Sequence, residues 1–126
     1  MDKKKKRNFL HKITHESWWP ILEPLVDKEE FDKILQAYAT SKKNNINVYP
    51  PIGDMLNAFK FSIREKMRVF MLGQDPYPQR GRASGLAFAN DPKREGRLSP
   101  SLDIIIQELV SDLRINEFDF YDKVDL

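Results

Sequence analysis

The stretch RVFMLGQDPYPQRGRASG, residues 68–85, decides how this sequence is interpreted. Its first five residues, 68–72, form a short apolar run that ends at a glycine, as is typical of a buried strand in a parallel sheet. The loop after it contains three glycines and two prolines. A strand followed by such a loop and then a helix predicts an α/β fold, in which ligands bind beyond the carboxyl ends of the strands. We therefore expect the functional site in this loop.

Two amphipathic helices are predicted on either side of this stretch. Apolar residues recur with helical spacing between residues 28 and 43 and again between residues 101 and 113, where Ser101 is the expected N-terminal cap. Trp18 is expected to pack in the core. Because 68–72 is the one convincing strand, we expect an incomplete parallel-sheet α/β/α domain.

Composition excludes several classes of protein. With 126 residues, 40% hydrophobic and 32% charged, the chain has the profile of a soluble globular protein of one domain or part of one. No apolar run approaches the roughly 18 residues that a membrane span needs, and the N-terminus has no apolar segment typical of a secretory signal. The absence of cysteine excludes disulfides, a thiol nucleophile and a cysteine zinc site.

Charge is distributed in blocks although the net charge is only +2. Residues 1–15 carry +5, residues 16–59 carry −3, residues 60–97 carry +5 and residues 98–126 carry −5. The first block predicts a basic, flexible N-terminal tail, and 16–126 is expected to form the folded part. The block 60–97 is a candidate nucleic-acid surface, because a phosphate backbone responds to local charge. A solvated surface is the alternative interpretation.

The loop itself contains groups suited to a planar ligand on a charged backbone. Asp75 lies between Gln74 and Pro76, and the proline restricts both its own backbone and that of Asp75. A carboxylate held in this way can orient and polarise a water molecule. Tyr77 and Phe88 are aromatic side chains that could surround a nucleobase. The alternative is a proline-rich turn in which the carboxylate binds backbone amides and the aromatic rings are core residues.

The motifs in this region resemble those of family 1 uracil-DNA glycosylases. The segments VFMLGQDPYP and GLAFAN are the most specific, and they are preceded by VYPP and NAF and followed by PSL in the family's order. The resemblance extends over residues 17–120 and implies the N-terminal portion of a uracil-DNA glycosylase-type α/β/α domain.

The resemblance also implies roles for individual residues. Asp75 matches the carboxylate that positions the attacking water, and Gln74 lies where the family's loop contacts the uracil carbonyl. Tyr77 matches the tyrosine that excludes the methyl group of thymine, and Phe88 matches the phenylalanine that stacks on the flipped base.

Pro100 and Ser101 match the loop that holds a DNA phosphate. The sequence departs from the family at Pro78 and Ser84, where histidines are common, and its proline-rich loop is short. The family's later asparagine-bearing strand and its His-Pro-Ser-Pro segment are absent.

The resulting expectation is a uracil-DNA glycosylase of base excision repair, hydrolysing the N-glycosidic bond of deoxyuridine in DNA. We expect no metal or other cofactor, uracil-containing DNA as the partner, no membrane association, a monomer, and a cytoplasmic location (nuclear in a eukaryotic host). The chain is expected to be truncated and weakly active or inactive. The alternative is a non-catalytic DNA- or protein-binding remnant. A nucleotide-binding α/β module is disfavoured because no glycine-rich phosphate-binding motif occurs.

Overall fold

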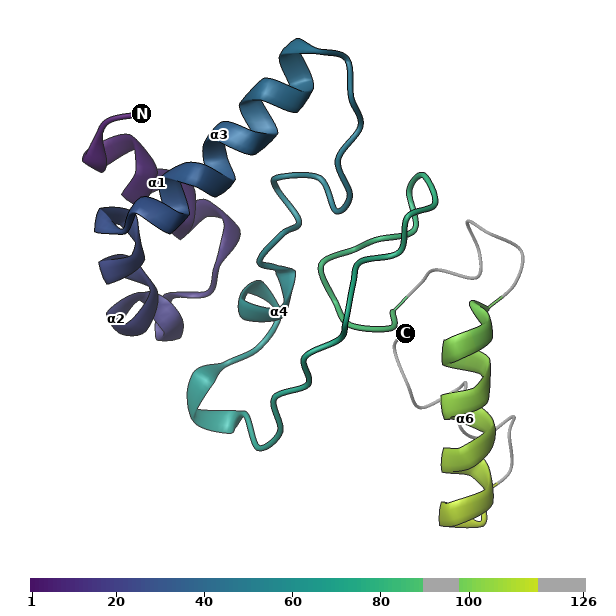
Figure 1. Ribbon diagram of the computed structural model, residues 1–126. Helices are drawn as coiled ribbons and strands as arrows, with labels where there is room; N and C mark the ends of the chain where they lie inside the picture. Colours follow the sequence, from purple (N-terminus) through teal and green to yellow (C-terminus); the bar gives the residue numbers. More distant parts are fainter. Residues whose placement is uncertain (90–97, 116–126) are drawn as a thin grey trace. The chain divides into compact units, whose positions relative to one another are not determined.

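The structure, a computed structural model, describes residues 1–89 and 98–115 (Figure 1). Contacts divide the chain after Leu86 into two compact units, Met1–Leu86 and Ala87–Leu126. Each unit has its own cluster of buried apolar side chains, so each is stabilised by a separate core. Residues 90–97 of the predicted basic block lie outside the described residues.

Helical segments make up most of the first unit. Helix α3 confirms the helix predicted over residues 28–43, and its acidic first turn and basic last turn suit the helix dipole. No helix in the described part of the chain is long and apolar enough to cross a membrane. The α-helices and 3₁₀ helices (η) of this unit are α1 (Lys3–Ile13), η1 (Glu16–Trp18), α2 (Trp19–Leu22), η2 (Glu23–Asp27), α3 (Glu29–Lys43), α4 (Asn57–Lys60) and η3 (Arg64–Lys66).

Helix α1 occupies most of the segment where we expected a flexible tail. The Asp2 carboxylate caps it by accepting a hydrogen bond from the Lys5 amide at 2.9 Å. Leu10 and Ile13 are buried on its inner face, and Lys6 is buried beside them. The basic composition concealed these apolar positions, which are what packs the helix against the rest of the unit.

The core of the first unit lies between α1, the segments that follow it and the start of α3. Trp18 is buried there, as predicted, and its ring meets that of Phe59 edge-on with 5.0 Å between centroids. This contact connects α4 to the core. The buried side chains of the cluster are Leu10, Trp18, Leu22, Val26 and Phe31.

The α/β fold that we expected is not observed, because residues 1–89 and 98–115 contain no β-strand. The predicted strand, residues 68–72, is irregular and exposed, with 79% of Val69 and 86% of Leu72 accessible to solvent. A parallel strand obtains its hydrogen bonds from neighbouring strands, and the described residues provide none. The apolar composition of 68–72 therefore does not produce a strand here.

Helix α6 (Pro100–Leu113) confirms the second predicted helix, although it begins one residue earlier. Its cap is Ser99, whose hydroxyl accepts a hydrogen bond from the Leu102 amide at 3.3 Å. Ser101 lies exposed in the first turn, so its predicted capping role is wrong. Pro100 occupies the first helical position, where a missing N–H has no cost. The apolar cluster of this second unit contains Leu102, Ile106, Phe88, Leu98 and Val110.

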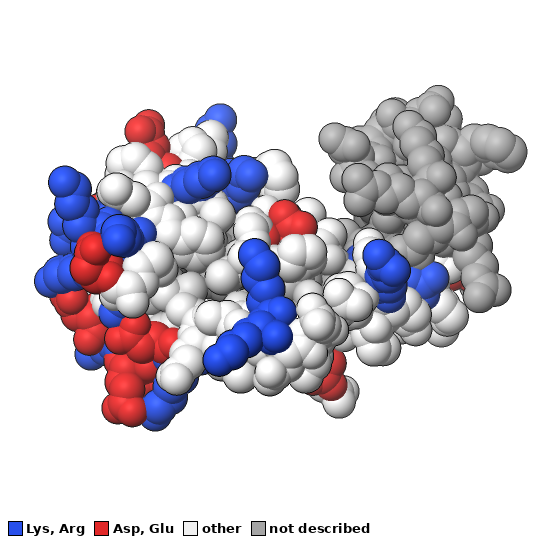
Figure 2. All heavy atoms as spheres, turned by 90° about the horizontal axis from the view of Figure 1, so that it is seen from above, with Lys and Arg blue, Asp and Glu red and all other residues white. Residues whose placement is uncertain are grey.

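Opposite charges are closely paired around α1. The Lys3 ammonium lies 2.7 Å from the Asp27 carboxylate, and the Arg7 guanidinium lies 3.6 Å from that of Glu23. Figure 2 shows the resulting mixture of basic and acidic side chains over the part of the first unit that contains α1 to α3. The basic block of residues 1–15 is thus partly neutralised by acidic residues of the block that follows it.

Candidate active-site loop

The residues predicted to act on a substrate lie in the loop 73–85 of the first unit. Gln74 and Asp75 are exposed, and Tyr77 is half-buried. Asp75 does not extend from a strand, since 68–72 is irregular. A pocket of about 530 Å³ lies elsewhere in this unit, where α3 meets residues 45–52, and no residue of the loop lines it. The carboxylate of Asp75 is therefore accessible to water and to a ligand from solution.

Tyr77 is associated with a cation from the far limb of the same loop. The guanidinium carbon of Arg82 lies 5.8 Å from the centroid of the Tyr77 ring, within the range of a cation–π interaction. The Arg82 amide donates a hydrogen bond to the Gln79 carbonyl at 3.2 Å, which turns the chain back between them. The loop thus presents an aromatic ring, a guanidinium group and a carboxylate within a few residues of one another.

The returning limb of the loop, residues 83–85, is fixed to the start of α4 and to the turn before it. The side-chain amide of Asn57 donates a hydrogen bond to the Ser84 carbonyl at 2.7 Å. At Gly85 a Cβ would lie only 1.8 Å from the backbone oxygen of Asp54. Because the φ of Gly85 is +78°, a conformation that L residues rarely adopt, this close approach requires glycine for two reasons.

The outgoing limb, meaning residues 68–72 that lead into the loop, also reaches α4. The ring of Phe70 lies against that of Phe59, with 6.2 Å between centroids. Both limbs of the loop therefore attach to the same short helix and the turn before it.

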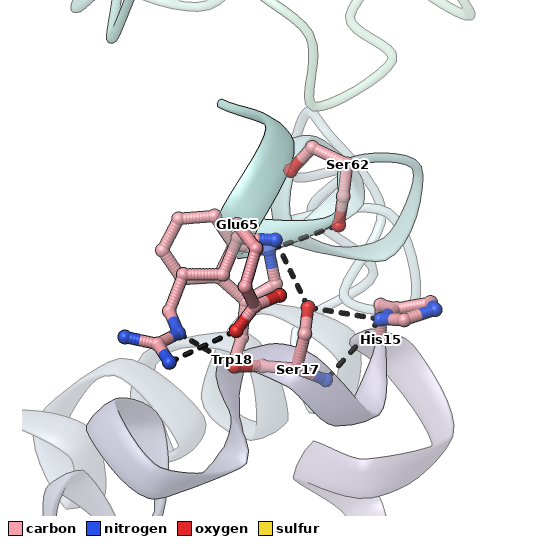
Figure 3. Close-up of polar contacts among 6 residues, drawn as sticks. His15, Ser17, Trp18, Ser62 and Glu65 are labelled. Atoms are coloured by element: carbon pink, nitrogen blue, oxygen red, sulfur yellow. Dashed lines mark hydrogen bonds and ion pairs between the residues drawn. The ribbon is translucent and has the colours of Figure 1, made fainter. Parts of the chain in front are cut away.

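A network of polar contacts holds α4 and η3 against the N-terminal segments (Figure 3). The indole N–H of Trp18 donates to the Ser62 carbonyl at 3.0 Å, and the His15 amide donates to the Phe59 carbonyl at 2.9 Å. The hydroxyl of Ser17 accepts from the Arg64 amide at 3.0 Å and contacts His15 Nδ1 at 2.9 Å. Three of these contacts, all except the one between Ser17 and His15, join residues more than forty positions apart, so the support of the loop is anchored in the core of the unit.

The other predicted site residues belong to the second unit. Phe88 is half-buried with a φ of +62° and packs against the Leu102 and Ile106 cluster. Pro100 and Ser101 are exposed in the first turn of α6. The structure thus brings Gln74, Asp75 and Tyr77 together in one loop, while Phe88 and the predicted phosphate-binding residues lie in a different unit.

The described residues contain no group of three or more His, Cys, Asp or Glu side chains that could hold a metal ion. Sequence reasoning missed Asn57, which appeared there only as part of the NAF motif. Its partner Ser84 lies 27 positions away, and no local pattern signals such a contact.

Comparison with known proteins shows which proteins the chain is similar to. No protein-family model matches the chain, and no solved structure matches it. A curated uracil-DNA glycosylase from Fusobacterium nucleatum is 44% identical over 96 residues, which is 76% of this chain and 41% of the relative. One from Campylobacter jejuni is 36% identical over 101 residues, covering 80% and 43%. A uracil-DNA glycosylase 1 from Listeria innocua is 36% identical over 100 residues, covering 79% and 44%.

These matches confirm the resemblance to uracil-DNA glycosylases over about four fifths of the chain. A matched stretch of 96 residues cannot avoid the middle of a 126-residue chain, so it includes the loop 73–85. The chain spans about two fifths of the length of the curated relatives it matches.

Proposed function

We propose that this chain carries the water-positioning part of a uracil-DNA glycosylase, an enzyme that hydrolyses the N-glycosidic bond of deoxyuridine in DNA. The observation that supports this most strongly is the similarity to proteins named uracil-DNA glycosylase across the segment that contains GQDPYP. The exposed Asp75 carboxylate in the same loop as Tyr77 suits this chemistry. Base excision repair is the process in which such a reaction belongs.

In the proposed reaction, Asp75 accepts a hydrogen bond from the attacking water and orients it toward C1′ of the deoxyribose. The bond between C1′ and N1 of uracil breaks, uracil departs with the electron pair, and the water oxygen bonds to C1′. The proton that the water loses passes to the Asp75 carboxylate. The products are free uracil and an abasic site, and the step requires no redox cofactor.

The remaining site residues have binding roles in this proposal. Gln74 contacts the uracil carbonyl through its backbone, and the Tyr77 ring excludes the 5-methyl group of thymine. Phe88 stacks on the extruded base, and Pro100 and Ser101 lie where a phosphate is held. Residues 16–126 are proposed to form part of the glycosylase domain, which we expect to act as a monomer in the cytoplasm or, in a eukaryote, the nucleus.

The test is release of uracil from a single-stranded oligonucleotide that contains one deoxyuridine, with protein in excess of DNA because the chain spans about two fifths of its relatives' length. Asp75→Asn keeps the size of the side chain but removes the carboxylate. We expect it to slow release by about 10²- to 10⁴-fold, the usual contribution of a general base. Asp112→Asn, an exposed substitution of the same kind in α6, is the control and should have no effect.

Equal release by the original chain and Asp75→Asn would overturn the proposed role of Asp75. Binding of the oligonucleotide without any uracil release would instead support a non-catalytic DNA-binding remnant.

A further inference from the structure

Two attachments of the loop that carries Asp75 and Tyr77 are visible among the described residues, and both lead to α4 or to the turn before it. On the outgoing limb the attachment is the contact between the rings of Phe70 and Phe59. On the returning limb it is the bond from Asn57 to the Ser84 carbonyl together with the close approach of Gly85 to Asp54. The thirteen residues between Phe70 and Ser84 include the predicted catalytic carboxylate. Whatever fixes the two ends limits where that carboxylate can lie.

Of the two attachments, the one through Asn57 is the more specific. Asn57 is buried, with only 7% of the residue exposed, and its hydrogen bond to the half-buried Ser84 is partly shielded from water. A ring contact at 6.2 Å tolerates sliding, whereas a 2.7 Å hydrogen bond fixes both distance and direction. Ala83, next to the bonded carbonyl, is also buried. The returning limb is therefore held in place at residues 83–85.

A buried asparagine here is otherwise difficult to explain. Its Oδ1 atom has no hydrogen-bond partner among the described residues, nor does the neighbouring Ser84 hydroxyl. Burying polar atoms without partners is unfavourable. An apolar side chain would avoid that cost if packing were the sole requirement, so the informative feature of Asn57 is the donor it offers to the loop.

We propose that Asn57 is a positioning residue, which holds the returning limb of the loop through the Ser84 carbonyl and thereby fixes Asp75 and Tyr77. The consequence for catalysis rests on the proposed function, whereas the consequence for loop order does not. Misplacing a reacting group by about 1 Å can cost 10²-fold in rate even when the mutation lies away from the chemistry. Loss of this bond should therefore lower kcat more than it changes KM.

The test compares Asn57→Leu with the original chain. Leucine has a similar size and suits a buried position but cannot donate to the Ser84 carbonyl. Arg80 and Arg82 provide trypsin sites inside the loop, and Lys42 and Lys43 provide sites at the end of α3, away from it. Asn47→Leu is the matched control, since Asn47 is an exposed asparagine outside the loop.

We expect Asn57→Leu to increase cleavage after Arg80 and Arg82 at least tenfold while cleavage after Lys42 and Lys43 is unchanged. Gly85→Ala breaks the same attachment from the other side, because its Cβ would overlap the Asp54 oxygen. The double variant should be cleaved no faster than the faster single variant, because both substitutions disrupt the same attachment of the returning limb.

Unchanged cleavage in Asn57→Leu, or an equal increase at all four sites, would overturn the proposal. In a uracil-release assay with DNA in excess of protein, Asn57→Leu should lower kcat about 10- to 100-fold with KM within twofold of the original value. A rise in KM at constant kcat would contradict the positioning role. If the original chain releases no uracil, the proposed function fails, and the trypsin result still decides whether Asn57 holds the loop.

Discussion

The Tyr38 hydroxyl links α3 to the segment that leads into α4. It donates a hydrogen bond to the Pro50 carbonyl at 2.8 Å. Burial, together with the negative charge of Asp54, raises the pKa of Tyr38 above its ordinary value of 10.0. Both effects disfavour the ionised phenolate, and ionisation would also remove the donor. The contact therefore depends on a neutral side chain.

This dependence predicts how stability changes in alkaline solution. Because the pKa of Tyr38 is higher in the folded than in the unfolded chain, its contribution is fully present below pH 10 and is lost as the pH rises through the folded-state value. We expect the difference in unfolding free energy between the original chain and Tyr38→Phe to shrink above about pH 10. Urea titrations at several pH values measure it, with Tyr49→Phe as the control. A difference that grows with pH would contradict this account.

At the scale of elements, Lys6 connects α1 to two others. Its ammonium group donates to the Val26 carbonyl in η2 at 3.3 Å and pairs with the Asp32 carboxylate in α3. The lysine side chain is mostly buried, whereas Asp32 is half exposed. Without this lysine, Asp32 would be solvated but the buried carbonyl of Val26 would lose a donor.

Replacing Lys6 with methionine keeps most of the packing of the side chain and removes the charge. We expect a loss of about 1–3 kcal/mol in the free energy of unfolding, the usual cost of leaving a buried polar group without a partner. Lys4→Met, on the exposed side of the same helix, should change stability by less than about 0.5 kcal/mol. Chemical denaturation of the original chain and the two variants measures this. An equal loss of unfolding free energy in both variants would show that stability depends only on the total charge of the helix.

The elements differ in how well the sequence predicts them, for a physical reason. Helices α3 and α6 satisfy their own hydrogen bonds, so their apolar periodicity was sufficient to locate them. The segment 68–72 would need neighbouring strands to become a strand, and its composition could not supply them. The sequence also grouped Gln74, Asp75 and Tyr77 in one loop correctly, but Asn57 depends on a contact between distant positions.

At the scale of the whole molecule, the segment 68–72 contains the longest run of exposed large apolar residues in the described part of the chain. Phe70 and Met71 are also more than half exposed, so four consecutive apolar residues are each mostly accessible to solvent. Contiguous exposed apolar residues favour association between chains.

We therefore expect the chain to associate as its concentration increases and the double variant Val69→Lys and Leu72→Lys to associate less. Light scattering over a range of concentrations measures this. The matched control is Ile21→Lys with Ile104→Lys, which adds the same charge at two isolated exposed positions. A similar reduction in both variants would attribute the effect to net charge instead of to residues 68–72.

The close approach of Gly85 to the backbone of Asp54 has a stereochemical consequence. The two hydrogens on its α-carbon are not equivalent, because only the one that an L side chain would replace points at the Asp54 carbonyl. An L residue is disfavoured twice at this position, by the left-handed backbone and by that oxygen. A residue of the opposite hand would meet neither obstacle. Position 85 therefore discriminates between L and D residues. Glycine, which is achiral, is the one genetically encoded amino acid that avoids both obstacles.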